Sequence, residues 1–413
     1  MTTYTIPYGE SSLSFEIPGA MTVEVLEPKS VSPHVESREL VEESLRRSSL
    51  KCFKNLSSAA IAINDKTRPV PHQHLLPPLL KKLETIGIPS QNITLIIATG
   101  AHDPMRPESF PEVVPLEILD RYRVVSHDCD DTRNLVNLGE TERGTPVWIN
   151  RIYADSALRV VVGNIEPHQF QGFSGGVKSA VIGLAGRETI NANHAWLTDP
   201  RARLGAYQDN PARQDVEEIG KLLGVHFALN TVLNDQKEIL YALAGPPQEI
   251  MTNAIPLVRD LYELEVAEPF DFLIVSPGGH PKDINLYQAQ KALTHAALVA
   301  REGATILLAA ACPEGVGDDA FSTWMREDAT LEDILARFQR EGFQVGPHKA
   351  YLFARESTRL DLYLNTSLAA QDLDSLHLRS VEDLQTFLNA RLPGKGRIGI
   401  IPYANATIPK IKD

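Results

Sequence analysis

Three segments of this chain share one order of parts: a buried aliphatic run, a loop with polar side chains, and a stretch of helical character. The aliphatic runs and their loops span residues 57–71, 93–105 and 158–167. Strands that alternate with helices predict a mostly parallel sheet, and chemistry in such sheets collects at the carboxyl ends of the strands. The polar side chains expected at these ends are Asp65, Arg68, His102 and His168.

A similar unit of strand, glycine loop and helix begins at residue 270, and a further strand is expected at 304–317. With 413 residues and 43% hydrophobic residues, the chain can bury a large core, so we expect two α/β domains. The boundary is placed near Glu268. The predicted domains are 1–268, completed by the C-terminal segment 400–413, and 269–399.

The bulk composition excludes some classes of partner. A formal charge of −13 argues against nucleic acid, which needs clustered Lys and Arg, but allows a small anionic substrate. Neither a signal peptide nor a run of about 18 apolar residues is visible, so no membrane association is expected. The three cysteines are far apart and are interpreted as reduced thiols of a cytoplasmic protein.

Residues 166–194 are rich in groups suited to chemistry, with five glycines, two histidines and a lysine. Part of this segment, GFSGGVKS, nearly fits the phosphate-loop pattern of nucleotide triphosphatases, but Val177 replaces the glycine before Lys178. The substitution argues against a triphosphate. A strand, a glycine-rich turn and a helix N-terminus still predict a cradle for a smaller anion.

His168, Lys178 and His194 each have an ordinary interpretation as surface side chains. Together they indicate a nucleophilic amine beside imidazoles that bind a metal or transfer protons. The acidic run at 127–131 could ligate a cation, but a solvated loop is the better prediction.

Several separated motifs, in order, resemble the nickel-dependent lactate racemase family. The long segment contains EPHQFQGFSGGVK followed by NANH, which is similar to the family pattern E-P-H-x-x-x-G-F-S-G-G-x-K and N-x-x-H. The further matches are DKTRP at 65–69, ATGAH at 98–102 and PKDINLYQAQK at 281–291. The resemblance covers nearly the whole chain.

The resemblance implies a nickel-pincer nucleotide, a pyridinium mononucleotide with two sulfur-bearing arms that hold nickel. It implies a covalent bond from Lys178 to one arm and nickel coordination by His194, which suits the preference of nickel for imidazole. It also places the cofactor and the active site in the cleft between the domains. Residues expected near the cofactor are Asp65, Gly172, Ser174, Gly175 and Gly176.

The reaction implied is racemisation or epimerisation of a 2-hydroxy acid. The Cα hydrogen is too weakly acidic for a side-chain base, whereas removing the hydroxyl proton and moving the hydrogen as hydride gives a flat 2-keto acid. One histidine is wanted for each enantiomer, and the resemblance assigns His102 and His168. The residues expected to bind the substrate are Arg68, Tyr287, Gln288 and Lys291.

Lactate is the first expected substrate, with cofactor-making enzymes as transient partners. Many family members carry arginine after the first histidine, whereas this chain has Asp103, which leaves malate, another short 2-hydroxy acid or a sugar acid open. The rival functions are a non-catalytic nucleotide-binding scaffold and a zinc hydrolase that uses His102, His168 and His194. The sequence sets no oligomeric state.

Overall fold

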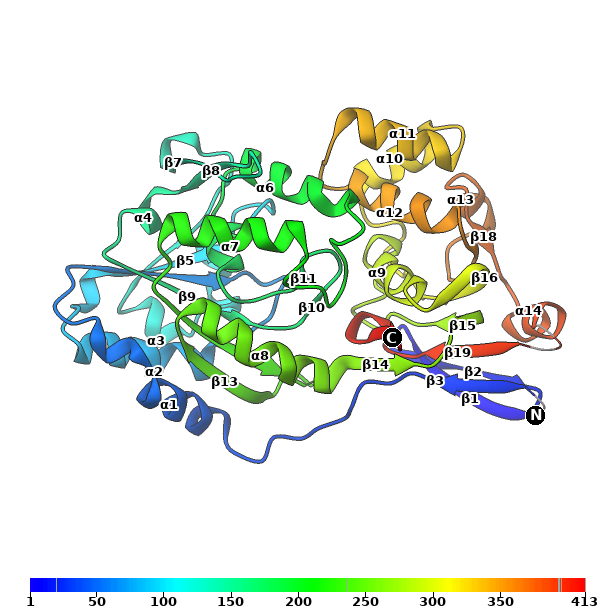
Figure 1. The fold of residues 1–413 in the computed structure, drawn as a ribbon, viewed down its shortest axis with the longest axis horizontal. Helices are drawn as coiled ribbons and strands as arrows, with labels where there is room; N and C mark the ends of the chain where they lie inside the picture. The colour runs from blue at the N-terminus through cyan, green and yellow to red at the C-terminus, as the bar shows by residue number, and fades with distance from the viewer. Residues whose placement is uncertain (20, 235, 393, 395, 413) are drawn as a thin grey trace. The chain divides into compact units, whose positions relative to one another are not determined.

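The computed structural model describes residues 1–19, 21–234, 236–392, 394 and 396–412. The chain forms two compact units. Ser30–Leu261 is called the N-terminal unit, and Met1–Lys29 with Tyr262–Asp413 is called the C-terminal unit. Both are α/β, with sheets that are mainly parallel (Figure 1), so the predicted fold class is confirmed. Among the described residues, no helix is both long and apolar enough to cross a membrane.

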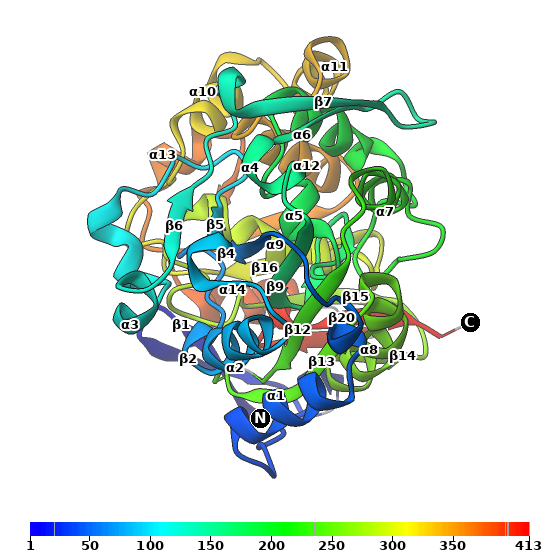
Figure 2. The ribbon, with the colours of Figure 1, turned by 90° about the vertical axis from the view of Figure 1, so that its left-hand side faces the viewer.

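The N-terminal unit is built on a sheet that has, in its described part, six strands in the order β13-β12-β9-β4-β5-β6 (Figure 2). The pairs are parallel except for β12 with β13. The bounds are β4 Ala59–Asn64, β5 Ile93–Ala98, β6 Arg123–Ser126, β9 Leu158–Asn164, β12 Phe227–Leu233 and β13 Ile239–Gly245. The three strands expected from the aliphatic runs are therefore neighbours at the centre of the sheet.

Helices bury both faces of this sheet, which is why β4, β5 and β9 are almost continuously apolar. On one face, Leu76 and Leu79 of α2 pack with alternate strand residues such as Ile61 and Leu95. α5 contacts β4, β9 and α7 in the same unit. The helices of the unit are α1 Ser37–Arg47, α2 His72–Thr85, α3 Leu116–Leu119, α4 Arg151–Ala154, α5 Lys178–Val181, α6 Arg187–His194, α7 Pro211–Leu223 and α8 Pro247–Tyr262, which ends at the boundary between the units. Two short hairpins pair β7 Leu135–Glu140 with β8 Pro146–Asn150, and β10 Pro167–His168 with β11 Gly172–Phe173.

The C-terminal unit contains a second sheet, which has six strands within the described residues, ordered β18-β17-β16-β15-β19-β3 and parallel throughout. Its strands are β3 Thr22–Val25, β15 Phe270–Val275, β16 Ala300–Ala309, β17 Asp361–Asn365, β18 Arg379–Ser380 and β19 Arg397–Ile401. The hairpin of β1 (Thr2–Tyr8) and β2 (Ser11–Ile17) packs Ile6 and Phe15 onto this sheet. The helices are α9 Leu286–Ala297, α10 Asp319–Glu327, α11 Leu331–Glu341, α12 Pro347–Ser357, α13 Ala370–Asp374 and α14 Leu384–Arg391.

The division differs from the expected domain boundaries at both chain ends. Residues 1–29 belong to the C-terminal unit, because β3 pairs with β19 at the edge of its sheet. Segment 400–413, expected to complete the first domain, also stays in the C-terminal unit, where β20 (Ile408–Ile411) pairs with β14 (Glu263–Val266). The expected boundary near Glu268 falls a few residues after Leu261. These placements depend on strand pairing between distant segments, which local sequence patterns do not reveal.

Candidate active site

Asp65 and His102 form a pair at the carboxyl ends of β4 and β5. Asp65 is 3% exposed, whereas the side chain of His102 is 44% exposed. His102 Nδ1 lies 2.8 Å from Asp65 Oδ2, and the Thr67 hydroxyl donates to Asp65 Oδ1 over 2.7 Å. Burial raises the pKa of Asp65, but the hydrogen bonds from His102 and Thr67 outweigh it and hold that pKa below its usual value. Because an ionised carboxylate can only accept, His102 donates through Nδ1 and leaves Nε2 as a base.

Arg68 lies in the exposed loop that follows Asp65. Its backbone N–H donates to the Asp65 carbonyl over 3.2 Å, and its charge also lowers the pKa of the Asp65 carboxyl. One carboxylate oxygen of Asp65 is hydrogen-bonded to His102 and the other to Thr67, so Asp65 orients the His102 ring. Its contact with a cofactor stays a prediction.

Hydrogen bonds tie the loops after the central strands to the glycine-rich segment. Ser179 Oγ donates to Asn64 Oδ1 over 2.8 Å, which links α5 to the end of β4. The Gly100 amide donates to the Gly183 carbonyl over 3.0 Å, which links the turn after β5 to the end of the same segment. The polar residues expected at the strand ends and the segment that carries Lys178 therefore meet at one edge of one sheet.

The glycines of this segment are required by backbone conformation and by packing against protein. Gly172, Gly175 and Gly176 have φ values of +73°, +77° and +60°. A Cβ on Gly172 would overlap the Ala206 carbonyl, and one on Gly175 would overlap the Ile165 side chain. These residues let the loop press against its neighbours.

The expected anion cradle of loop amides and a helix N-terminus is not what the structure shows. The Gly176 N–H donates to Asn230 Oδ1 over 2.7 Å, and the Ser174 N–H donates to the Glu166 carbonyl over 2.8 Å. α5 is a single turn, Lys178–Val181, so the helix N-terminus expected after the glycine-rich turn belongs to a very short helix. A helix this short has little dipole to attract an anion. The loop instead fixes the backbone of Lys178, which is 6% exposed, and contact of its residues with a cofactor stays a prediction.

His168 and His194 come from different elements and contact the same phenyl ring. His168 lies in β10 and His194 at the end of α6, and the ring centre of each is 5.0 Å from that of Phe170. Phe170 is 7% exposed. The structure thus brings together two residues that are 26 positions apart in the chain (194 − 168).

Each of these imidazoles is held through Nδ1. The Gln171 backbone N–H donates to His168 Nδ1 over 3.2 Å. His194 Nδ1 lies 3.1 Å from the Asn193 side-chain oxygen. In both rings these contacts involve Nδ1 and not Nε2.

In the C-terminal unit, Tyr287, Gln288 and Lys291 lie in the first turns of α9. Asn285 caps this helix by accepting the Gln288 N–H over 2.9 Å. Lys291 Nζ donates to Gln288 Oε1 over 3.0 Å, because residues three apart lie on the same face of a helix. Burial raises the pKa of Tyr287 to about 12, which keeps its phenol protonated.

A second lysine, Lys349 of α12, packs against the same helix. It is 3% exposed, donates to Gln290 Oε1 over 2.9 Å and lies 5.5 Å from the Tyr287 ring centre. Burial, with the nearby Lys291 charge, lowers the pKa of Lys349 well below its usual value. Sequence reasoning missed it, because a single lysine in an amphipathic helix gives no spacing signal.

Two further metal sites were considered from the sequence, one in the acidic run at 127–131 and one, for zinc, formed by three histidines. In the acidic run, Arg187 binds both carboxylate oxygens of Asp130, at 2.7 and 2.6 Å. Within the described part of the chain, Asp128, Cys129 and Asp130 form a group whose possible ligand atoms all lie within 4.8 Å of one another. His102, His168 and His194 do not converge in this way, which removes the support for a zinc hydrolase.

Comparison with known proteins supports the family suggested by the motifs. A sequence model of the lactate racemase N-terminal domain matches residues 8–205, and one of the lactate racemase C-terminal domain matches residues 266–396. A protein named lactate racemase from Thermoanaerobacterium thermosaccharolyticum is 31% identical over 351 residues, 83% of this chain and 82% of that protein. Another protein of that name, from Lactiplantibacillus plantarum, is 33% identical over 63% of this chain and 62% of its own length.

Solved structures agree with the fold. The lactate racemase apoprotein from T. thermosaccharolyticum superimposes with a TM-score of 0.92 over 100% of both chains, at 27% identity. A Thermotoga maritima protein that is 18% identical has a TM-score of 0.67 over 91% of this chain and 97% of its own, and shares the fold. From the two domain matches and the extended identity, this chain belongs to the lactate racemase family of isomerases.

Proposed function

We propose that the protein interconverts the enantiomers of a short 2-hydroxy acid, lactate first, through a 2-keto acid. The observation that carries the proposal is the pairing of His102 with the buried Asp65 carboxylate over 2.8 Å. This pairing builds a general base whose Nε2 faces away from its orienting acid, the arrangement required to take a hydroxyl proton. Family membership supports the same reaction type.

His102 and His168 divide the proton transfers. His102 Nε2 accepts the hydroxyl proton of one enantiomer, and His168 does so for the other. The configuration is inverted when the hydrogen returns to the opposite face of the flat 2-keto acid, and the histidine on that side then returns the proton to the substrate oxygen. Neither histidine needs to remove the Cα hydrogen, which is too weakly acidic for imidazole.

Arg68 and Lys291 bind the substrate carboxylate in this proposal. The planar guanidinium of Arg68 suits a two-point grip on a carboxylate. Lys291, already hydrogen-bonded to Gln288, adds a point charge, and the protonated Tyr287 phenol remains a donor. These side chains would select a small acid by its carboxylate. They do not determine which substituent Cα carries besides its hydroxyl, its carboxylate and its hydrogen.

The family implies a nickel-pincer nucleotide, and the side chains present suit it. Lys178 supplies a buried primary amine for a covalent bond, and His194 supplies an imidazole for nickel. When bound, this cofactor supplies the acceptor and donor of the hydride. The chain's own part is to hold the cofactor, orient the substrate and move the hydroxyl proton.

The test is to produce the protein in a host supplied with nickel and the cofactor-making enzymes, beside Lys178→Ala. Intact mass, peptide mapping and metal analysis should show a nucleotide on Lys178 with nickel, and neither in Lys178→Ala. The loaded protein should racemise lactate more rapidly than malate or a sugar acid. His102→Asn and His168→Asn should keep the cofactor and lose turnover.

Two outcomes would contradict the proposal. An unmodified chain without nickel, from a host in which a control racemase is loaded, would favour a nucleotide-binding scaffold. Normal racemisation by both histidine variants would exclude the two-base scheme.

A further inference from the structure

A buried carboxylate in α7 begins a chain of hydrogen bonds that ends at both His194 and His168. Asp215 is fully buried and accepts the Asn193 Nδ2 amide over 2.8 Å and the Thr141 hydroxyl over 2.7 Å. Asn193 Nδ2 also donates to the Ala212 carbonyl over 2.9 Å. Both partners of Nδ2 can only accept, so the orientation of the Asn193 amide is fixed.

The fixed amide decides the tautomer of His194. With Nδ2 turned to Asp215 and Ala212, the Asn193 oxygen Oδ1 faces His194 Nδ1 at 3.1 Å. An amide oxygen can only accept, so Nδ1 of His194 must carry the proton. In the neutral ring Nε2 then keeps its lone pair, which is the form that binds a metal ion.

The same amide oxygen fixes the orientation of Gln171. Gln171 Nε2 donates to Asn193 Oδ1 over 2.6 Å, and the Gln171 side chain is fully buried. The backbone N–H of Gln171 donates to His168 Nδ1 over 3.2 Å, so Nδ1 of His168 is unprotonated. The neutral ring of His168 therefore carries its proton on Nε2, opposite to His194 and to His102.

We propose that Asp215, Asn193 and Gln171 are positioning residues that hold His194 in the tautomer with a protonated Nδ1, in which Nε2 has the lone pair that a metal ion needs, and His168 in the tautomer with a protonated Nε2. The roles of the two histidines rest on the proposed function, but the tautomers rest on the hydrogen bonds alone. His168 becomes a base at Nε2 only in its other tautomer, which forms when solvent water takes the proton from Nε2 and supplies one to Nδ1, and this breaks the bond from the Gln171 amide. The two bases of the site are thus unequal at rest.

The first test uses the unloaded wild-type protein. Nitrogen NMR of ¹⁵N-histidine-labelled protein, at a pH where the rings are neutral, distinguishes protonated from unprotonated ring nitrogens. His168→Asn and His194→Asn assign the signals by their loss. We expect a protonated Nδ1 in His194 and a protonated Nε2 in His168. A protonated Nε2 in His194 would overturn the proposal, even if the protein proves to be an active racemase.

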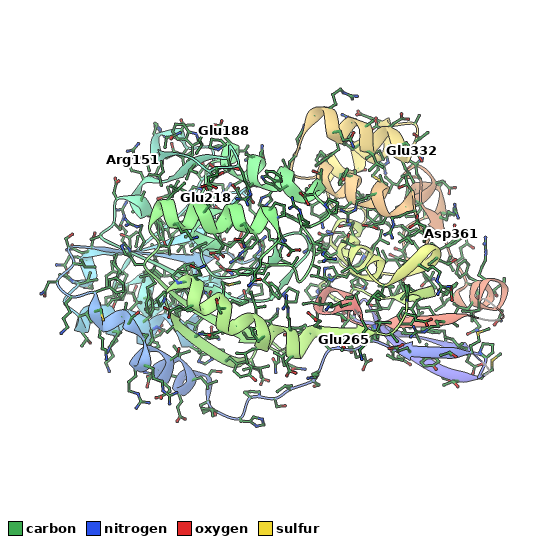
Figure 3. The ribbon with its side chains drawn as sticks, viewed as in Figure 1. Arg151, Glu188, Glu218, Glu265, Glu332 and Asp361 are labelled. Atoms are coloured by element: carbon green, nitrogen blue, oxygen red, sulfur yellow. The ribbon has the colours of Figure 1, made fainter. Side chains whose placement is uncertain are left out.

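The second test changes the chain of hydrogen bonds. Asn193→Ala removes the acceptor, so both tautomers of His194 should be populated, whereas Asp215→Asn keeps an acceptor for Asn193 and should retain the wild-type signals. Glu188→Gln is the matched control, because Glu188 lies exposed on the same helix α6 (Figure 3). Unchanged His194 signals in a folded Asn193→Ala protein would contradict the proposal.

The third test measures metal binding apart from activity. In the loading host, Asn193→Ala should carry the nucleotide on Lys178 but retain nickel with roughly 10- to 100-fold lower affinity, the usual effect of removing a partner of a metal-bound imidazole. Glu188→Gln should retain both. Equal nickel retention by Asn193→Ala and wild type would contradict the positioning role. If wild type itself carries no nucleotide, the proposed function fails while the NMR result still stands.

Discussion

The imidazole of His102 and the carboxylate of Asp65 are joined by a 2.8 Å hydrogen bond between Nδ1 and Oδ2. The carboxylate is buried, whereas the imidazole is 44% exposed, so the pair presents one basic nitrogen to its surroundings and hides the group that orients it. In the proposed reaction, Asp65 is therefore a positioning residue for the His102 base.

Asp65→Asn should lower kcat by about 10²- to 10⁴-fold with little change in KM, because the base tautomer of His102 is no longer enforced. Racemisation by the loaded enzyme measures this. Glu108→Gln, which removes an exposed carboxylate of the same unit, should stay close to wild type. A loss in Asp65→Asn of less than about threefold would show that the pair does not act in catalysis.

The loop that carries Lys178 should not tolerate a side chain at Gly175. Gly175 and Gly144 share a φ of +77°, but a Cβ would overlap Ile165 at Gly175 and has open space at Gly144. Gly144→Ala should cost about 1 kcal/mol for the backbone conformation alone. Gly175→Ala should cost a further ~1–3 kcal/mol because of overpacking. Denaturant unfolding compares the two, and equal losses would show that the loop relaxes around the methyl group.

His72 should make the N-terminal unit sensitive to acid. Burial lowers its pKa to about 4, although the hydrogen bond to the Val113 carbonyl acts in the opposite direction. Because the pKa is depressed in the folded state, the unfolded chain binds the proton first. This contribution to stability is present above pH ~6.5 and is lost as the pH falls to about 4.

The full loss corresponds to roughly 3 kcal/mol in the free energy of unfolding. His72→Asn keeps a donor for Val113 and does not titrate, so its unfolding free energy should fall less steeply over this range. Urea denaturation at several pH values measures the slopes. Parallel slopes for wild type and variant would mean that His72 is not a source of acid sensitivity.

Much of the fold was predictable from local patterns. The aliphatic runs that form β4, β5 and β9 are continuous because helices cover both faces of the sheet, and such runs are visible in a single sequence. The edge strand β13 (Ile239–Gly245) was missed, because a short apolar run such as ILYALAG cannot be told from a buried helix segment by periodicity alone. The placement of residues 1–29 was also missed, since it depends on the pairing of β3 with β19, in which Thr22 lies opposite Arg397.

The sequence named the residues of the candidate site one by one, and their roles stay predictions, but it did not reveal the hydrogen bonds that connect them. Motif resemblance pointed to His102, His168, Lys178 and His194, yet it did not reveal that Asp65 orients His102. For Asn193, the only sign in the sequence of a role in this network was its position next to His194. Asp215 had none, because a carboxylate in a helix normally faces solvent, and here the bonds from Thr141 and Asn193 offset the cost of burying it.

The central claim is that the enantiomers interconvert by hydride transfer and not by loss of a Cα proton. The most direct measurement is racemisation of L-lactate deuterated at Cα by the loaded enzyme in ordinary water, with mass analysis of the D-lactate formed. The account predicts that the product keeps its deuterium. Replacement of that deuterium by solvent hydrogen would contradict it and indicate direct deprotonation at Cα.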